Sequence, residues 1–252
     1  MRNLKVTIGY DGTKFQGWQE QKQGRTIEGE ICKALFFMHK HPVDINAAGR
    51  TDSGVHATGQ VINYQSDLDT IPIDRYCRAL NSFLPLDIRA RQIVEEDHSF
   101  HARYDARERT YKYYLYPSDL MESHFRIYSD RIVRRPNIVQ LNNLAAVLEG
   151  THDFTTFSAP SDETPNRVRT IFSSCFHMEG PFLVYQISGN GFLWRMVRSI
   201  VGSLLTYEIE KIDAAEMRQR LQAANRKLAG PTAPAWGLFL HRVRYKNENC
   251  LY

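Results

Sequence analysis

The sequence predicts an α+β fold made of two consecutive ferredoxin-like lobes, each of the split βαβ type. Two kinds of segment support this: alternating apolar positions typical of strands, and apolar positions at helical spacing between them. A similar order of these segments in both halves of the chain is the third observation. We expect the lobes to form an extended, mainly antiparallel sheet with helices on one side and a central cleft. The length of 252 residues fits two domains or one large one.

The first lobe follows the order β-α-β-β-α-β. We expect strands over residues 4–10, 43–47, 60–64 and 88–94, with helices over 27–38 and 73–83. Apolar residues alternate in the longer strand segments and recur every three or four residues in the helices. Thr26 suits an N-cap, and Pro72 suits the opening of the second helix. A polar loop joins the two short strands.

The second lobe repeats much of this order. We expect strands over residues 109–116, 168–178, 182–187 and 238–245, with helices over 138–148, 192–205 and 213–225. Gly150 suits the end of the first of these helices, and Asp213 and Glu216 have capping-box spacing. We therefore expect an N-terminal lobe over 1–104 and a C-terminal lobe over 105–252. A cleft between two lobes is a common place for a ligand site.

Arginines gather in short groups within residues 103–112, 131–135, 167–169 and 195–198, and the formal net charge is +4. Tyrosines are interleaved with one of these groups, over residues 111–116. Arginine suits phosphate recognition, and aromatic rings suit stacking on unpaired bases. The same pattern also fits a solvated face on a mildly basic enzyme, so composition alone does not decide between the two.

The four cysteines are far apart in the sequence, which indicates free thiols in a reducing compartment instead of a disulfide frame or a zinc site. The N-terminus runs directly into a strand pattern, with no signal peptide and no apolar run of membrane-spanning length. We expect a cytoplasmic protein without a membrane partner. No phosphate-binding P-loop or dinucleotide fingerprint is present, which argues against an enzyme dependent on ATP or NAD.

The most informative segment is the loop over residues 49–57, which contains Asp52 between Gly49 and Gly54, with Arg50 two residues before it. Glycines on both sides allow close backbone approach to a ligand and positive φ angles. Such a loop can present one carboxylate with a cation nearby. Asp-Ser-Gly is also an ordinary turn sequence, and other residues must decide between the two interpretations.

Two residues of the second lobe are further candidates. Arg198 lies on the predicted helix 192–205, where it is either a solvent-pointing residue or the partner of Asp52 across the cleft. An ion pair there holds the aspartate in place as a nucleophile or base. Tyr111 lies on the predicted strand 109–116, where it is either a sheet residue or a ring for stacking on a base with a hydroxyl for proton transfer.

Motifs along nearly the whole chain resemble the bacterial tRNA pseudouridine synthase A family. They include Tyr10-Asp11-Gly12, Gly17-Trp18-Gln19, the 49–57 loop, Phe100-His101-Ala102-Arg103, Arg109-Thr110-Tyr111, Met196-Val197-Arg198 and Ala235-Trp236-Gly237. The departures from the family pattern are slight. Ser53 stands where alanine is commoner, and the segment 189–192 varies.

The resemblance implies isomerisation of uridine to pseudouridine at positions 38, 39 and 40 of the tRNA anticodon stem-loop. It implies that Asp52 is the catalytic nucleophile and that Tyr111 stacks on the target base and assists proton transfer. It further implies that Arg198 pairs with Asp52 and that Arg50 helps to displace the target nucleotide. No cofactor is expected, because the reaction has no net redox change. No metal site is expected, because the sequence has no His-Glu-x-x-His motif and its cysteines are dispersed. The family resemblance implies a homodimer.

Alternatives remain open at this point. The carboxylate of Asp52 can attack the sugar C1′ or the base, or abstract a sugar proton, and the range of tRNA sites can be different or narrower. A non-catalytic RNA-binding protein is a second hypothesis, because fold does not fix function. A nucleosidase or glycoside hydrolase is a third, with a carboxylate pair drawn from Asp11, Asp52 and Asp153.

Overall fold

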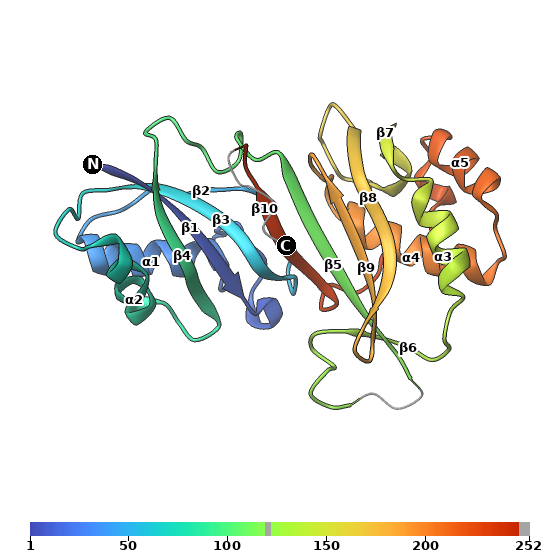
Figure 1. Ribbon diagram of the computed structural model, residues 1–252, viewed down its shortest axis with the longest axis horizontal. Helices are drawn as coiled ribbons and strands as arrows, with labels where there is room; N and C mark the ends of the chain where they lie inside the picture. The colour runs from blue at the N-terminus through green and yellow to red at the C-terminus, as the bar shows by residue number, and fades with distance from the viewer. Residues whose placement is uncertain (119–121, 247–252) are drawn as a thin grey trace. The chain divides into compact units, whose positions relative to one another are not determined.

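The computed structural model describes residues 1–118 and 122–246, and it confirms the α+β class (Figure 1). The chain divides into two compact units. Unit 1 comprises Met1–Arg107 together with the segment that begins at Phe239, and unit 2 comprises Glu108–Leu238. In the described part of the chain, no helix has both the length and the apolar character needed to cross a membrane.

Unit 1 has the strand order of a split βαβ fold. Its elements are β1 (Arg2–Tyr10), α1 (Ile27–His39), β2 (Asn46–Ala47), β3 (His56–Ser66), α2 (Ile73–Phe83), β4 (Ile88–Glu96) and β10 (Leu238–Arg244). Strand β1 lies between β4 and β3 and is antiparallel to both, and β2 pairs with β3 on its other edge. Helices α1 and α2 pack against each other (Figure 1).

Alternating burial and helix capping explain the first elements of unit 1. Leu4, Val6 and Ile8 are buried on β1, as the sequence pattern predicts. The Thr26 side chain accepts a hydrogen bond from the backbone N–H of Gly29 and so caps α1, which confirms the predicted N-cap. The predicted strand 60–64 is longer in the structure and begins at His56, directly after the polar loop.

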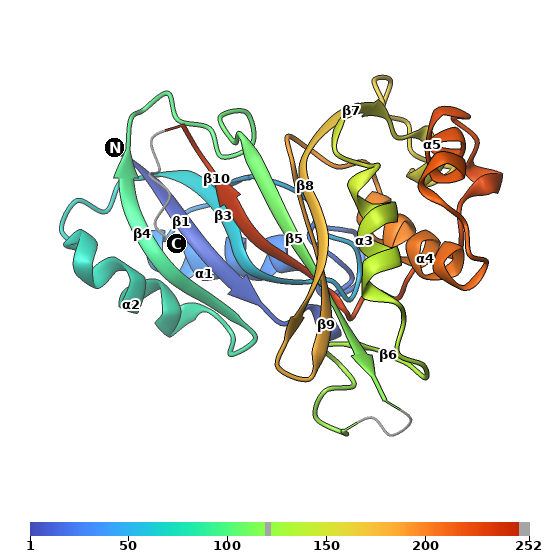
Figure 2. The same ribbon diagram turned by 45° about the vertical axis from the view of Figure 1, so that its right-hand side comes forward.

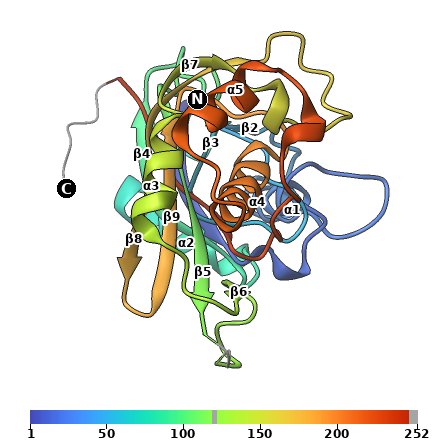
Figure 3. The ribbon, with the colours of Figure 1, turned by 90° about the vertical axis from the view of Figure 1, so that its right-hand side faces the viewer.

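Unit 2 is built around the antiparallel strand order β5-β9-β8-β7. Its elements are β5 (Glu108–Pro117), β6 (Asp130–Ile132), α3 (Ile138–Ala146), β7 (Gly150–Asp153), β8 (Val168–Glu179), β9 (Phe182–Gly189), α4 (Met196–Ile209) and α5 (Ala214–Gln222). Helix α3 packs on β8 and contacts α4 and α5 (Figures 2 and 3). The predicted cap of α5 is confirmed, because the Asp213 side chain accepts from the N–H of Glu216.

Several elements differ from the sequence-based expectation. The strand expected over 43–47 is shortened to β2, and the short strands β6 and β7 were not expected. The helix expected over 192–205 begins only at Met196, because Arg195 has a left-handed backbone conformation with φ 57°. This helix, α4, continues to Ile209. The strand expected to close the second lobe is β10, which pairs in parallel with β3 of unit 1 through Phe239 and Leu240. Alternating apolar residues predict such a strand but do not identify its partner.

Candidate active site

Asp52 lies at the start of a tight turn that leads into β3. The turn is closed by a hydrogen bond of 3.1 Å from the backbone N–H of Val55 to the carbonyl of Asp52. Gly54, the third residue of the turn, has φ 77°, a conformation that favours glycine. Thr51 is buried, Asp52 is half-buried and Arg50 is exposed. The loop is therefore anchored through Thr51 and presents the two neighbouring charged side chains.

The Gly17-Trp18 motif holds this loop from one side. The backbone N–H of Trp18 donates to the carbonyl of Thr51 at 3.0 Å, and the Trp18 side chain is 1% exposed. The hydroxyls of Tyr10 and Thr51 are 2.8 Å apart. Gly17 has φ 94°, and a Cβ atom there would lie 3.0 Å from the carbonyl oxygen of Thr51. Glycine is thus required for this backbone approach.

Gly12 holds the other end of the loop. A Cβ atom on Gly12 would lie only 2.0 Å from the carbonyl oxygen of Val55, so any larger residue would displace the turn. The backbone N–H of Gly12 donates to Nδ1 of His56 at 3.0 Å. The His56 ring is fully buried and stacks on Phe239, with ring centroids 4.6 Å apart. His56 therefore acts as a structural residue beneath the loop.

Tyr111 lies on β5, opposite Ile187 of β9, and is 8% exposed. Its ring meets the ring of Phe192 edge-on, with centroids 5.0 Å apart and an interplanar angle of 80°. Side chains alternate along β5, because Lys112 and Tyr114 both contact Glu179 on the face opposite to Tyr111.

Tyr113 is fully buried, and its hydroxyl donates to the carbonyl of Pro234 at 3.0 Å. Burial, followed by the negative charge of Asp130, holds the pKa of Tyr113 well above its usual value. It is therefore a core residue of unit 2. Its hydroxyl ties β5 to the segment that also holds Arg198.

Arg198 lies in the first turn of α4 and is half-buried. Its Nε donates to the carbonyl of Ala233 at 2.7 Å, and the backbone N–H of Ala233 donates back to the carbonyl of Arg198 at 3.0 Å. One turn further along α4, Gly202 leaves room for the carbonyl group of Pro231. A Cβ atom on residue 202 would lie 1.8 Å from that carbonyl oxygen. The segment 231–234 therefore packs directly on the backbone of α4 and orients the arginine.

Asp162, which no sequence motif indicated, fixes the start of α4. Its side chain is buried and accepts from the backbone N–H groups of Trp194 at 2.8 Å and Thr164 at 2.9 Å. Burial alone would raise the pKa of Asp162, but these hydrogen bonds and the charge of Arg167 outweigh it, so the pKa is lowered. The Asp-x-Thr spacing is a local turn signal, but nothing local indicates the contact with Trp194.

The four predicted site residues divide between the units. Asp52 and Arg50 share the loop of unit 1, whereas Tyr111 and Arg198 belong to unit 2. The ion pair between Asp52 and Arg198 stays a prediction. Among the residues that the structure describes, one group of His and Asp side chains has the spacing of a metal site, at the end of β3 remote from the Asp52 loop.

A two-lobed α+β fold with an aspartate held on a glycine-braced loop agrees with the family model described as tRNA pseudouridine synthase. That model matches residues 7–105 and 144–246, which is most of the chain. The chain belongs to the tRNA pseudouridine synthase family, a family of enzymes, and the resemblance found in the motifs is confirmed.

Curated relatives extend the match to nearly the whole chain. The chain is 42% identical to a tRNA pseudouridine synthase A of Treponema denticola, over 98% of this chain and 94% of the relative. It is also 42% identical to the tRNA pseudouridine synthase A of Bacillus subtilis, over 97% and 99%. A solved structure, a Cbf5-Nop10-Gar1 complex, aligns with 96% of this chain and 59% of that chain at 10% identity and a TM-score of 0.37, too weak a likeness to add to the argument.

Proposed function

We propose that this protein isomerises uridine to pseudouridine at positions 38, 39 and 40 of the tRNA anticodon stem-loop, with Asp52 as the nucleophile. The observation that carries the proposal is the rigid presentation of Asp52 in a chain of the tRNA pseudouridine synthase family. The reaction detaches uracil from the sugar, turns it and rejoins it through carbon. A carboxylate with a fixed position suits this sequence, because it must act on the same nucleoside before and after the base turns.

The braces around Asp52 support this role in a specific way. Backbone contacts from Gly12 and Trp18 hold the loop on both sides of the carboxylate, so little conformational freedom is lost when substrate binds. A free turn would have to be ordered at each encounter, at about 1–2 kcal/mol per residue. The short-turn interpretation and the catalytic interpretation of the sequence are thus compatible.

The remaining site residues have proposed roles that offset the cost of extracting the uridine. Taking a nucleotide out of its stack costs a few kcal/mol. Stacking on the Tyr111 ring supplies about 1–3 kcal/mol. Arg50 is exposed beside Asp52, where it can occupy the place of the displaced nucleotide or contact phosphate. Arg198, oriented by Ala233, provides the cation that pairs with Asp52 in the proposed active site.

The contacts of two aspartates favour an isomerase over a hydrolase that uses a pair of carboxylates. Asp11 accepts from the N–H and the hydroxyl of Thr13, and Asp153 accepts from the N–H and the hydroxyl of Thr155. Both side chains cap short turns. They are the two aspartates that the sequence offers as partners for Asp52, and in each of them one carboxylate oxygen is already held by two capping hydrogen bonds.

The proposal includes a homodimer in the cytoplasm, with one tRNA able to touch both subunits, and no cofactor. Family membership and the arginine groups of the sequence support a tRNA partner. Sedimentation of the purified protein checks the oligomeric state. A species of about one chain mass, 29.2 kDa, at micromolar concentration would contradict the dimer.

Three unmodified tRNA transcripts test the substrate assignment. Each has one uridine in the 38–40 segment, at position 38, 39 or 40, and cytidine or a purine at the other two with base pairing preserved. Pseudouridine mapping after incubation with the enzyme is expected to find the product at each single uridine. Product outside the anticodon stem-loop would contradict the proposed substrate, and product at only one position would contradict the proposed range.

A further inference from the structure

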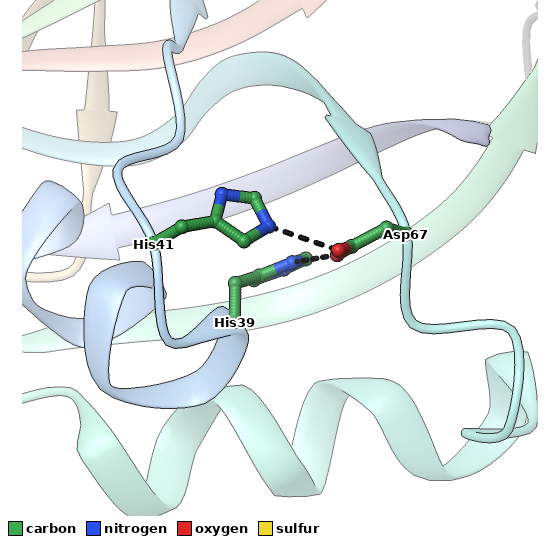
Figure 4. Close-up of side chains that lie close together, drawn as sticks. All are labelled: His39, His41 and Asp67. Carbon is green, nitrogen blue, oxygen red and sulfur yellow. Dashed lines mark hydrogen bonds and ion pairs between the residues drawn. The ribbon is translucent and has the colours of Figure 1, made fainter.

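Three side chains of unit 1 converge at the end of β3 that is remote from the Asp52 loop (Figure 4). His39 is the last residue of α1, His41 lies two residues later, and Asp67 follows β3 directly. Nδ1 of His39 lies 2.7 Å from Oδ1 of Asp67, and Nε2 of His41 lies 2.9 Å from Oδ2. The three ligand atoms all lie within 4.8 Å of one another.

A second polar contact holds the other ring nitrogen of each histidine. Nδ1 of His41 faces the carbonyl of Pro42 at 2.9 Å, and because a carbonyl only accepts, this nitrogen must donate. Nε2 of His39 lies 3.1 Å from the hydroxyl of Tyr76, which in turn lies 2.7 Å from Oγ of Ser66. Metal-binding histidines have this arrangement, in which the second ring nitrogen is held by a carbonyl or another polar group.

The carboxylate of Asp67 takes both histidine contacts, one on each of its oxygens. Imidazole nitrogens and carboxylate oxygens are ligand atoms for a metal ion. The three side chains therefore have the geometry of a candidate metal site.

We propose that Nδ1 of His39, Nε2 of His41 and the carboxylate of Asp67 bind a first-row transition metal ion of the Zn²⁺ type. Two imidazoles and one carboxylate are typical zinc ligands, whereas Mg²⁺ and Ca²⁺ prefer sites made of oxygen. Three protein ligands leave a fourth position for water. The end of α1 adds the negative end of the helix dipole, which favours a cation near His39.

The exposure of the ligands allows a metal ion to reach the site. The His39 side chain is fully buried and preorganised, whereas the side chains of His41 and Asp67 are 47% and 40% exposed. Tetrahedral Zn–N and Zn–O bonds of about 2.0–2.2 Å put ligand atoms about 3.4 Å apart. The two N···O contacts of 2.7 and 2.9 Å must therefore lengthen, while the widest separation shortens from within 4.8 Å. The exposed His41 side chain, outside α1 and β3, can make this adjustment while His39 stays in place.

The site is separate from the proposed catalysis. Strand β3 has 11 residues, so its two ends are about 33 Å apart along the strand. A metal ion there would fasten the end of α1 to the end of β3 and stabilise unit 1 by binding only the folded state. Its presence or absence is therefore tested independently of pseudouridine formation.

Calorimetric titration of the tag-free, chelator-treated full chain with ZnCl₂ tests this proposal. We expect one ion per chain in the wild type, binding at least tenfold weaker in His41→Ala and in Asp67→Asn, and no binding of MgCl₂. His98→Ala and Asp69→Asn change exposed residues outside the cluster and serve as matched controls with unchanged affinity. Thermal melts of the metal-free variants check that each is folded.

Co²⁺ gives a second measurement, because its visible absorption reports tetrahedral coordination and the kind of ligand. Nitrogen and oxygen ligation without a thiolate charge-transfer band is expected in the wild type, and loss of the tetrahedral spectrum is expected in His41→Ala. No Zn²⁺ binding by the wild type would overturn the proposal. Binding that His41→Ala and Asp67→Asn leave unchanged, or a thiolate band in the Co²⁺ spectrum, would overturn it equally.

Discussion

Replacing Gly202 with alanine should destabilise this protein, although alanine is the better helix former. Gly202 lies within α4, where the backbone of the segment 231–233 packs directly on the helix. A Cβ atom at this position would lie 1.8 Å from the carbonyl oxygen of Pro231 and 3.3 Å from the backbone nitrogen of Ala233. Both neighbours are backbone atoms, so no side-chain rotation can relieve the contact.

The opposing contributions can be compared directly. Alanine gains about 1 kcal/mol over glycine from helix propensity. Overpacking costs about 1–3 kcal/mol. Displacing the segment also weakens the two hydrogen bonds between Arg198 and Ala233, worth about 1 kcal/mol for the neutral bond and about 1.5–3 for the charged one. The net loss is roughly 2.5–6 kcal/mol, which corresponds to a fall in Tm of roughly 5–24 °C for a chain of this length.

Thermal denaturation of Gly202→Ala beside Gly191→Ala checks this expectation. A Cβ atom on Gly191 meets only the Arg169 side chain, at 3.5 Å and beyond, so this control should melt within about 2 °C of the wild type. Gly202→Ala should also lose activity at temperatures well below its Tm, because its contacts orient Arg198. If Gly202→Ala melts at or above the wild-type temperature, the segment 231–233 is not locked against α4 and the reasoning is wrong.

Asp162→Asn should lower the free energy of unfolding by about 1–2 kcal/mol at pH 7, because an amide accepts more weakly from the N–H groups of Trp194 and Thr164. The pKa of Asp162 is lowered in the folded state, so its stabilising effect is present above the unfolded pKa near 3.9 and is lost as pH falls through the folded pKa. The urea unfolding curves of wild type and variant should therefore converge in acid. A stability difference that stays constant with pH would contradict this. Burial, then the charge of Glu28, raises the pKa of Cys32 to about 11 from 9.0, so iodoacetamide at pH 8 should modify it about 100-fold more slowly in native than in unfolded protein, as followed by peptide mass spectrometry. Equal rates would disprove the burial argument. Tyr111→Phe should keep tRNA affinity and lower turnover about 100-fold or more if the hydroxyl transfers a proton, whereas unchanged turnover would limit the residue to stacking.

Local sequence signals predicted much of the fold. The alternation of β1, the helical spacing of α1 and the caps at Thr26 and Asp213 were all found where the pattern placed them. These features depend on residues within one element or its first turn, so the sequence contains the necessary information. The Asp52 loop was recognised in the same way, from its two glycines.

Contacts between distant segments were not predictable in this way. The motif containing Gly12 and the motif containing Gly17 were visible, but their packing against Val55 and Thr51 depends on the backbone path of the folded unit. Pairing of β10 with β3 and the contact of Asp162 with Trp194 likewise join residues far apart in sequence. A single sequence predicts such elements without identifying their partners.

The histidine–aspartate cluster illustrates the same limit. The sequence predicted no metal site, because His39 and His41 have no recognised metal-binding spacing and Asp67 lies 26 residues beyond His41. Only the antiparallel sheet of unit 1, which returns β3 toward the end of α1, brings the three side chains together (Figure 4).

The central claim is that Asp52 isomerises a uridine without releasing it. The most direct measurement incubates one unmodified tRNA with the wild type and with Asp52→Asn, and quantifies pseudouridine, free uracil and RNA mass in the same samples. The wild type should form pseudouridine in the anticodon stem-loop with unchanged RNA mass, and Asp52→Asn should bind the tRNA and form none. Free uracil from the wild type, or substantial turnover by a folded Asp52→Asn, would contradict the account.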